Sequence, residues 1–151
     1  MACDLSAGRL VPCKDNLGGI QEVYFVDYGD ITATTLTLDE VTDAEGTFNA
    51  YKYDLKGANS LETAITSSPD NGTTFFEQTI TLSLPKLTKE DMVQFKLIAY
   101  GRPLIICVDN NSNAFLCGRE HGMSVSGGSI TTGAAFGWSN FDTIWKRKTT
   151  T

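Results

Sequence analysis

The side chains of this chain that could take part in catalysis are few. His121 is the only histidine, and it follows Glu120, a neighbouring pair that could support general-base chemistry. No nucleophile-elbow motif marks any Ser or Thr as a partner for it. The carboxylates are scattered, and their spacing does not suggest a paired acid and base. We therefore predict no catalytic residues, with a small hydrolase centred on His121 as an alternative.

Binding sites for phosphate or metal are also poorly supported by the sequence. The segment Gly128-Ser-Ile-Thr-Thr-Gly133 resembles the opening of a phosphate-binding loop, but Ala134 and Ala135 stand where the lysine and hydroxyl residue should follow. Without that lysine the phosphate charge would lack compensation. The four cysteines would need further nearby ligands to hold zinc. We therefore expect no cofactor and no metal.

The cysteines come as two pairs of equal spacing, Cys3/Cys13 and Cys107/Cys117. In a chain without a recognisable secretory signal this count favours free thiols over a disulfide framework. The second pair flanks the turn-forming run 109–113, which lies between apolar segments at 104–108 and 114–116 and predicts a hairpin. In a hairpin centred on Asn111–Ser112, positions whose numbers sum to about 224 face each other, so Cys107 would lie across from Cys117, as small buried apolar side chains.

Length and composition predict a single domain, residues 1–151, with mainly β structure. Thr, Ser, Gly and Asn are abundant, and 41% of the residues are hydrophobic, which is enough for one core. The net charge of −6 gives no general attraction for nucleic acid. We interpret Lys146-Arg147-Lys148 as a solvated charged end of the chain, the alternative being an interaction patch. No apolar run approaches the ~18 residues that a membrane span needs.

The apolar pattern predicts several short strands. The clearest is 76–84, where Phe76, Ile80, Leu82 and Leu84 alternate with polar residues, as in a sheet with one face toward water or a channel. Asp39 to Gly46 is acidic and is expected to be an exposed loop. Further strands are expected at 23–26, 34–38, 47–55 and 61–66, whereas residues 1–19 are expected to be irregular.

One helix is predicted over about 88–100. Thr88 is the expected N-cap, with Asp91 three residues later completing a capping box. Gly101 is expected to end the helix. Its apolar stripe predicts a helix that covers the core through Met92, Phe95 and Ala99, widened by Val93 and Ile98.

Aromatic residues cluster near the C-terminus, at Trp138, Phe141 and Trp145. Such a cluster could be a platform for sugar or nucleic acid. Their mixed spacing and the nearby glycines favour core closure or a subunit interface. A carbohydrate-binding β-sandwich that uses Trp138 and Trp145 stays open as an alternative.

The glycine-rich C-terminal segment resembles that of phage tail tube proteins and related virion structural proteins. The shared pattern ends in a short aromatic strand, here 141–145, and the opening residues 7–31 are also similar, whereas the middle of the chain agrees only in kind. In this sequence the pattern corresponds to Gly118, Arg119, Gly122, Met123, Val125, Gly127, Gly128, Thr132, Gly133, Ala134, Ala135 and Gly137.

The resemblance implies an antiparallel β-sandwich or barrel with one flanking helix, assembled into rings that are commonly six-fold and that stack into a conduit for DNA. It implies a place in the virion tail, assembly in the bacterial cytoplasm, other tail or neck proteins as partners, and no membrane. A capsid decoration or head-fibre protein is the structural alternative. The candidate interface residues are Gly118, Gly122, Gly127, Gly128, Gly133, Trp138 and Trp145.

An acidic lumen would repel the phosphate backbone, so that DNA passes through the ring without specific binding. Lys146, Arg147 and Lys148 would then belong on an outer or inter-ring surface. The candidates for lumen acids are Asp39, Glu40, Asp43, Glu45 and Glu77.

Overall fold

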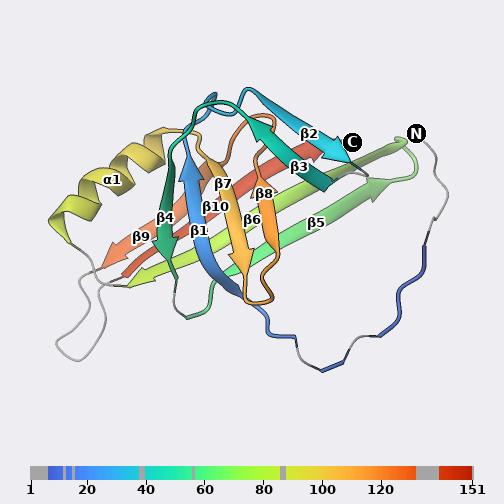
Figure 1. The fold of residues 1–151 in the computed structure, drawn as a ribbon, viewed down its shortest axis with the longest axis horizontal. Helices are drawn as coiled ribbons and strands as arrows, with labels where there is room; N and C mark the ends of the chain where they lie inside the picture. Colours follow the sequence, from blue (N-terminus) through green and yellow to red (C-terminus); the bar gives the residue numbers. More distant parts are fainter. Residues whose placement is uncertain are drawn as a thin grey trace.

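The computed structural model of the chain describes residues 7–11, 13–14, 16–37, 40–55, 57–85, 88–131 and 140–150. Their strands and single helix are shown in Figure 1. In chain order they are β1 (Ile20–Val26), β2 (Ala33–Thr37), β3 (Glu40–Glu45), β4 (Ala50–Asp54), β5 (Ser60–Ser68), β6 (Thr73–Pro85), α1 (Lys89–Tyr100), β7 (Leu104–Asp109), β8 (Ala114–Cys117), β9 (Ser124–Thr131) and β10 (Asn140–Thr150).

The strands form two four-stranded antiparallel sheets and a separate hairpin. Sheet I has the order β4-β1-β7-β8 and sheet II the order β5-β6-β10-β9, while β2 pairs with β3. Figure 1 shows the strands of sheet I crossing over those of sheet II, with α1 at one end. Each sheet is open, with two edge strands among the described residues. The predicted mainly β fold is confirmed, in its sandwich form and without closure into a barrel.

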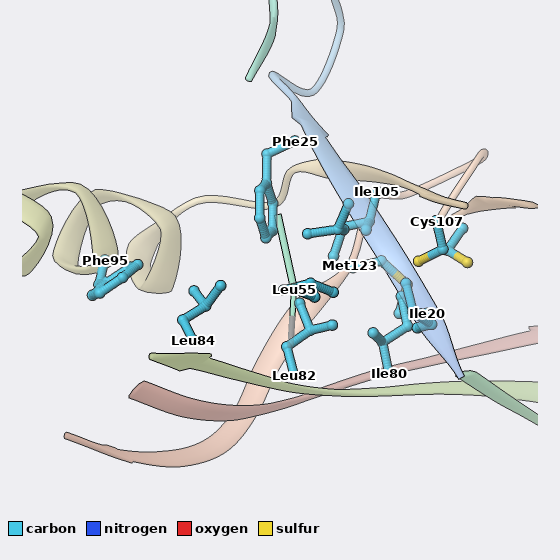
Figure 2. Close-up of a cluster of buried hydrophobic side chains, with 12 residues drawn as sticks. Ile20, Phe25, Leu55, Ile80, Leu82, Leu84, Phe95, Ile105, Cys107 and Met123 are labelled. Carbon is cyan, nitrogen blue, oxygen red and sulfur yellow. The ribbon is translucent and has the colours of Figure 1, made fainter. Parts of the chain in front are cut away.

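The hydrophobic core lies between the two sheets. Ile80, Leu82 and Leu84 project from β6 toward Phe25 and Ile105 of sheet I, as Figure 2 shows. The alternation predicted for this strand is therefore confirmed. Asn59, which is also buried, accepts a hydrogen bond from the Ser83 backbone N–H at 2.6 Å and, through its carbonyl, one from the Ile20 N–H at 3.3 Å. These bonds tie sheet I to sheet II at the start of β5.

The helix begins and ends as predicted, but it covers the core with fewer side chains. The Asp91 N–H donates to Thr88 Oγ1 and the Thr88 N–H to Asp91 Oδ2, both at 3.3 Å, which completes the capping box, and the Gly101 N–H donates to the Leu97 carbonyl. Only Phe95 is buried. The prediction that Met92 and Ala99 also face the core is wrong, because α1 covers one end of the sandwich and packs there through a narrow strip.

The acidic segment predicted to be a loop is a strand. Glu40–Glu45 forms β3 and pairs with β2, with Asp43 opposite Thr35 and Glu45 opposite Ala33. A two-stranded hairpin can keep acidic side chains in water while its backbone groups pair, so composition alone misleads here. The next strand, expected from residue 47, begins only at Ala50. Asp39 lies outside the described residues.

The β7–β8 hairpin is confirmed, but the predicted register is wrong by two residues. Cys107 lies opposite Phe115, and Ile105 opposite Cys117. The reason is a three-residue loop, in which the Ser112 N–H donates to the Asp109 carbonyl, the Asp109 N–H donates to the Asn113 carbonyl, and Ser112 has a φ of 65°. A turn followed by a left-handed residue is a common three-residue hairpin connection.

The last strand is longer than expected and includes the basic cluster. The predicted strand 141–145 is part of β10, which extends to Thr150 between β6 and β9. The register places Lys146 opposite Thr79, Arg147 opposite Gln78 and Lys148 opposite Glu77. The basic cluster is thus part of a paired strand of sheet II, in which Lys146 also lies opposite Ser124 of β9. No helix among the described residues is long and apolar enough to cross a membrane.

Candidate assembly surfaces

Helix α1 carries a second apolar stripe that faces away from the core. Val93, Leu97 and Tyr100 are 58, 62 and 82% exposed. At 100° per residue these three positions lie together on the side of the helix opposite Phe95. The sequence analysis missed this stripe because it assigned the apolar residues of the helix to one face. The i, i+4, i+7 spacing of Val93, Leu97 and Tyr100 was the available signal.

Beside this stripe a cleft of about 600 Å³ opens between α1 and the first strands of sheet I. Three tyrosines line it: Tyr28, Tyr51 and Tyr53. Tyr53 packs edge-on against Phe25, with the ring centroids 5.2 Å apart, and burial raises its pKa, with a smaller effect from the Asp91 charge. The Tyr28 hydroxyl donates to the Glu120 carbonyl at 3.1 Å. The cleft therefore has aromatic walls, of which Tyr28 and Tyr53 are held by these contacts, and it can receive an apolar side chain.

The loop between β8 and β9 is shaped by two of the predicted glycines. Gly118 and Gly122 have φ values of 75° and 71°, and the Gly122 N–H donates to the Gly118 carbonyl at 2.7 Å. A Cβ on Gly122 would overlap the Arg102 carbonyl oxygen. The adjacent Met123 is fully buried, and its N–H donates to the Pro103 carbonyl. These glycines hold the loop against the end of α1, which is a structural role.

The other predicted interface residues are distributed over sheet II. Gly127 and Gly128 lie in β9, and Gly127 has open space where a Cβ would stand. Trp145 lies in β10, with Ile80 and Val125 as its register partners. Gly133 and Trp138 lie outside the described residues, and with Trp138 so does half of the predicted aromatic platform of Trp138 and Trp145.

The acidic candidates for the lumen do not gather on one element. Asp43 and Glu45 are exposed on β3, Glu40 opens the same strand, and Glu77 lies half-buried on β6 of sheet II. The register places Glu77 between Ala64 of β5 and Lys148 of β10. The described candidates therefore lie on two separate elements, the β2–β3 hairpin and sheet II. Glu77, the candidate on sheet II, has Lys148 as its neighbour in the ladder.

The outer face of sheet II is broad and polar. Thr79, Thr81 and Ser83 follow Glu77 along β6 at alternate positions, on the face away from the buried Ile80 and Leu82. Glu62 of the edge strand β5 lies opposite Thr79, and Lys146 of β10 lies opposite it on the other side. Hydroxyl groups and acidic side chains are thus interspersed along β5 and β6 on this face, and the register places the position of Lys146 beside them.

The charged cluster on the outer face of sheet I is a set of surface ion pairs. Lys52 Nζ lies 2.7 Å from Glu22 Oε1 and 3.4 Å from Asp54 Oδ1, and the Tyr24 hydroxyl donates to Glu22 Oε2 at 3.0 Å. The hydrogen bond from Lys52, followed by that from Tyr24, lowers the pKa of Glu22. A carboxylate held ionised beside a lysine is suited to neither proton donation nor proton abstraction.

The residues considered for catalysis or metal binding also lie apart from one another. His121 is exposed, and the carboxylate of the adjacent Glu120 pairs with Arg119 at 3.6 Å. Cys107 and Cys117 are free thiols in the core, whereas Cys13 is free and exposed. No group of three or more His, Cys, Asp or Glu within the described ranges is arranged to hold a metal ion.

No family model matches the chain, and no match was found among curated proteins or solved structures. The resemblance to phage tail tube proteins accordingly rests on the sequence motifs alone, and the function that it implies is a proposal.

Proposed function

We propose that this chain is a virion structural protein, a tail tube or tail/neck ring subunit that self-assembles into stacked rings around a DNA conduit. The observation that carries the proposal is the outward stripe of α1. Val93, Leu97 and Tyr100 place three large apolar side chains in water next to an open cleft. Contiguous exposed apolar surface of this kind marks a protein–protein contact.

The energetics of this surface favour association. Burying a side chain of this size contributes about 1.5–3 kcal/mol. The open edges of both sheets offer further backbone donors and acceptors, since edge strands tend to be completed by a neighbour. A ring repeats the same contact around its circumference, so a modest pairwise affinity can support a stable assembly.

We propose that the outer face of sheet II lines the conduit. Between Glu77 and Ser83 the outward positions of β6 carry Thr79 and Thr81, so this stretch is rich in hydroxyl groups and holds no large apolar side chain. Glu62 and Glu77 stand among the positions of Lys146 and Lys148. Such a balance offsets local attraction for phosphate, so DNA passes through without being gripped. The sequence predicted an acidic lumen. We propose in its place that the conduit wall is the outer face of sheet II, on which the acidic residues offset the charge of the lysines.

Electron microscopy and light scattering of the purified protein test this proposal. Rings or short tubes are expected, and a chain that stays monomeric at high concentration and across salt conditions would contradict it. Replacing Val93 and Tyr100 with serine should shift the distribution toward monomer. Met92→Ser is the matched control, because Met92 is an exposed apolar side chain of the same helix that lies about 80° or more around the helix from every residue of the stripe.

The aromatic cleft favours one further candidate, a carbohydrate-binding module. Tyr28 and Tyr51 are more than half exposed there, and exposed aromatic rings can stack on sugars. In that case the protein remains monomeric, and Tyr51→Ala abolishes binding to a glycan array. Assembly of the wild type without glycan binding would exclude this candidate.

A further inference from the structure

The first described residues form an extended N-terminal arm, defined here as residues 7–11, 13–14 and 16–17. Leu10 and Val11 are 92 and 96% exposed, and Leu17 is also exposed. The described part of the arm has neither helix nor strand. Moving apolar side chains of this kind out of water lowers the free energy. An arm that presents them to solvent is therefore suited to binding an apolar surface.

The arm starts from one end of sheet I. The Leu17 N–H donates to Asn111 Oδ1 at 3.1 Å, and Asn110 Nδ2 donates to the Gly18 carbonyl at 2.7 Å. These bonds fix the root of the arm to the β7–β8 turn. Figure 1 shows the arm leading away from both sheets at this end.

The cleft beside α1 lies at the opposite end of the same sheet. Ile20 pairs with Asp109 near the arm, whereas Val26 pairs with Leu104 near the cleft, which Asp27, Tyr28 and Pro103 help to line. Strand β1 separates the two by roughly 20 Å, at about 3.3 Å per residue. One molecule therefore presents an apolar arm at one end of sheet I and an aromatic cleft at the other.

The cleft also borders an edge strand. Tyr51 and Tyr53 belong to β4, whose only ladder partner in the described part of the chain is β1. An extended segment can add to such an edge through main-chain hydrogen bonds while alternate side chains enter a neighbouring pocket. Arg9 and Lys14 are the charged residues in the described part of the arm. Asp27 lines the cleft and offers an opposite charge, although Arg102 lines the cleft as well.

We infer that the arm of one copy binds the α1–β4 cleft of the next copy, with Leu10 and Val11 packing against Leu97 and Tyr51. The occupant is a second copy of this chain, and the inference rests on the proposed function as an assembling subunit. Since arm and cleft lie at opposite ends of sheet I, the contact is head-to-tail. Head-to-tail contacts build closed rings or open stacks, whereas a two-fold contact would stop at a dimer.

Disulfide trapping tests the contact directly. A Cys3→Ser, Cys13→Ser background leaves only the two buried thiols, Cys107 and Cys117. In this background Val11→Cys is combined with Leu97→Cys and oxidised gently. Disulfides form only when the two Cα atoms lie about 4.4–6.8 Å apart. The matched control combines Val11→Cys with Ile65→Cys, an exposed apolar position on β5.

A ladder of covalent dimers and larger species is expected for the Val11–Leu97 pair on a non-reducing gel, and monomer for the control. A disulfide within one chain would overturn the inference by showing that the arm occupies its own cleft. Equal cross-linking in both pairs would overturn it as non-specific contact. If no cross-links form while the wild type still forms rings, the inference is overturned and the proposed function stands. If the wild type remains monomeric, both the inference and the proposed function are overturned.

Mixing two association-defective variants gives an independent readout. Leu10→Asp with Val11→Asp removes the arm contact, and Leu97→Asp removes the cleft contact; all three positions are exposed, so the fold should be retained and can be checked by circular dichroism. Each variant alone should be monomeric. Together they should form a heterodimer and nothing larger, because one intact arm and one intact cleft remain. Rings from the arm variant alone would contradict the inference.

Discussion

Cys107 and Cys117 lie diagonally across the β7–β8 hairpin, and both are almost completely buried in the core. Each faces a different residue in the ladder, Phe115 and Ile105 respectively, yet both side chains point into the core. Interaction with the Cys117 side chain, reinforced by burial, raises the pKa of Cys107 above its ordinary value. The pair therefore behaves as two small apolar side chains in the core.

The first prediction is that both thiols stay reduced and protected in the native protein. A thiol reagent should modify Cys13 at once but reach Cys107 and Cys117 only after unfolding, because the latter two are almost completely buried. Cys107→Ala should lower the free energy of unfolding by about 1 kcal/mol, as for deletion of a small buried group. Intact-mass measurement without reductant is the check. A native mass two protons lighter than the reduced chain would contradict the prediction.

The second prediction concerns Gly122→Ala. A left-handed φ costs a non-glycine residue about 1–2 kcal/mol, and the new Cβ would also overlap the Arg102 carbonyl oxygen. We expect the free energy of unfolding to fall by at least about 2 kcal/mol in urea denaturation.

Gly127→Ala is the matched control, because Gly127 has no positive φ and open space at its Cβ. It should change the stability by less than about 1 kcal/mol. Similar losses for both variants would show that the effect reflects glycine content and not the conformation of the 118–122 loop.

The fold was largely predictable because its strongest signals are local. The alternation along β6, the capping box of α1 and the Asn-rich turn each specify an element through neighbouring residues. The β2–β3 hairpin was not predictable from composition, since its acidic strand is formed by pairing with β2. The register of β7–β8 depended on Asp109, whose side chain selects a three-residue loop.

The candidate surfaces were less predictable, because they depend on how the elements are placed in three dimensions. The outward stripe of α1 was readable from helical spacing, but only the packing of Phe95 shows which side is buried. The cleft brings together Tyr28 from the turn after β1, Tyr51 from β4 and Leu97 from α1. The pairing of the basic cluster 146–148 with β6 likewise had no local signal in the sequence.

The third prediction is a pH dependence of stability at Asp109. Its carboxylate accepts hydrogen bonds from the backbone N–H groups of Asn113 and Asn111, each at 2.8 Å, and these lower its pKa. A lowered pKa in the folded state stabilises the protein above the unfolded value of about 3.9, and this contribution is lost as the pH falls through the folded value. Asp109→Asn should therefore be less stable than the wild type at neutral pH.

The difference between the wild type and Asp109→Asn should shrink in acid, below about pH 4. Thermal unfolding followed between neutral pH and pH 3 measures it. Asp70→Asn, in the β5–β6 turn, is the control and should show no comparable loss at neutral pH. A constant difference between wild type and Asp109→Asn at all pH values would mean that the side chain acts through shape and not through charge.

The fourth prediction distinguishes the two acidic surfaces of the assembled protein. If the outer face of sheet II lines the conduit, replacing Glu62 and Glu77 with lysine leaves the lysine positions of β10 without their acidic neighbours. The lumen then attracts phosphate. Assembled particles of this variant should bind duplex DNA with an affinity that falls steeply with salt, by a slope of about −0.9 per neutralised phosphate. The wild type should bind weakly under the same conditions.

Replacing Asp43 and Glu45 with lysine provides the control. This variant changes the net charge by the same amount as the sheet II variant, but on the exposed β2–β3 hairpin. Fluorescence anisotropy with labelled duplex DNA compares the two at several salt concentrations. Stronger, salt-sensitive binding by the sheet II variant supports this face as the conduit wall. Stronger binding by the hairpin variant would move the wall to β2–β3. Equal binding would show that DNA responds to net charge, and the assignment of sheet II to the conduit would then be wrong.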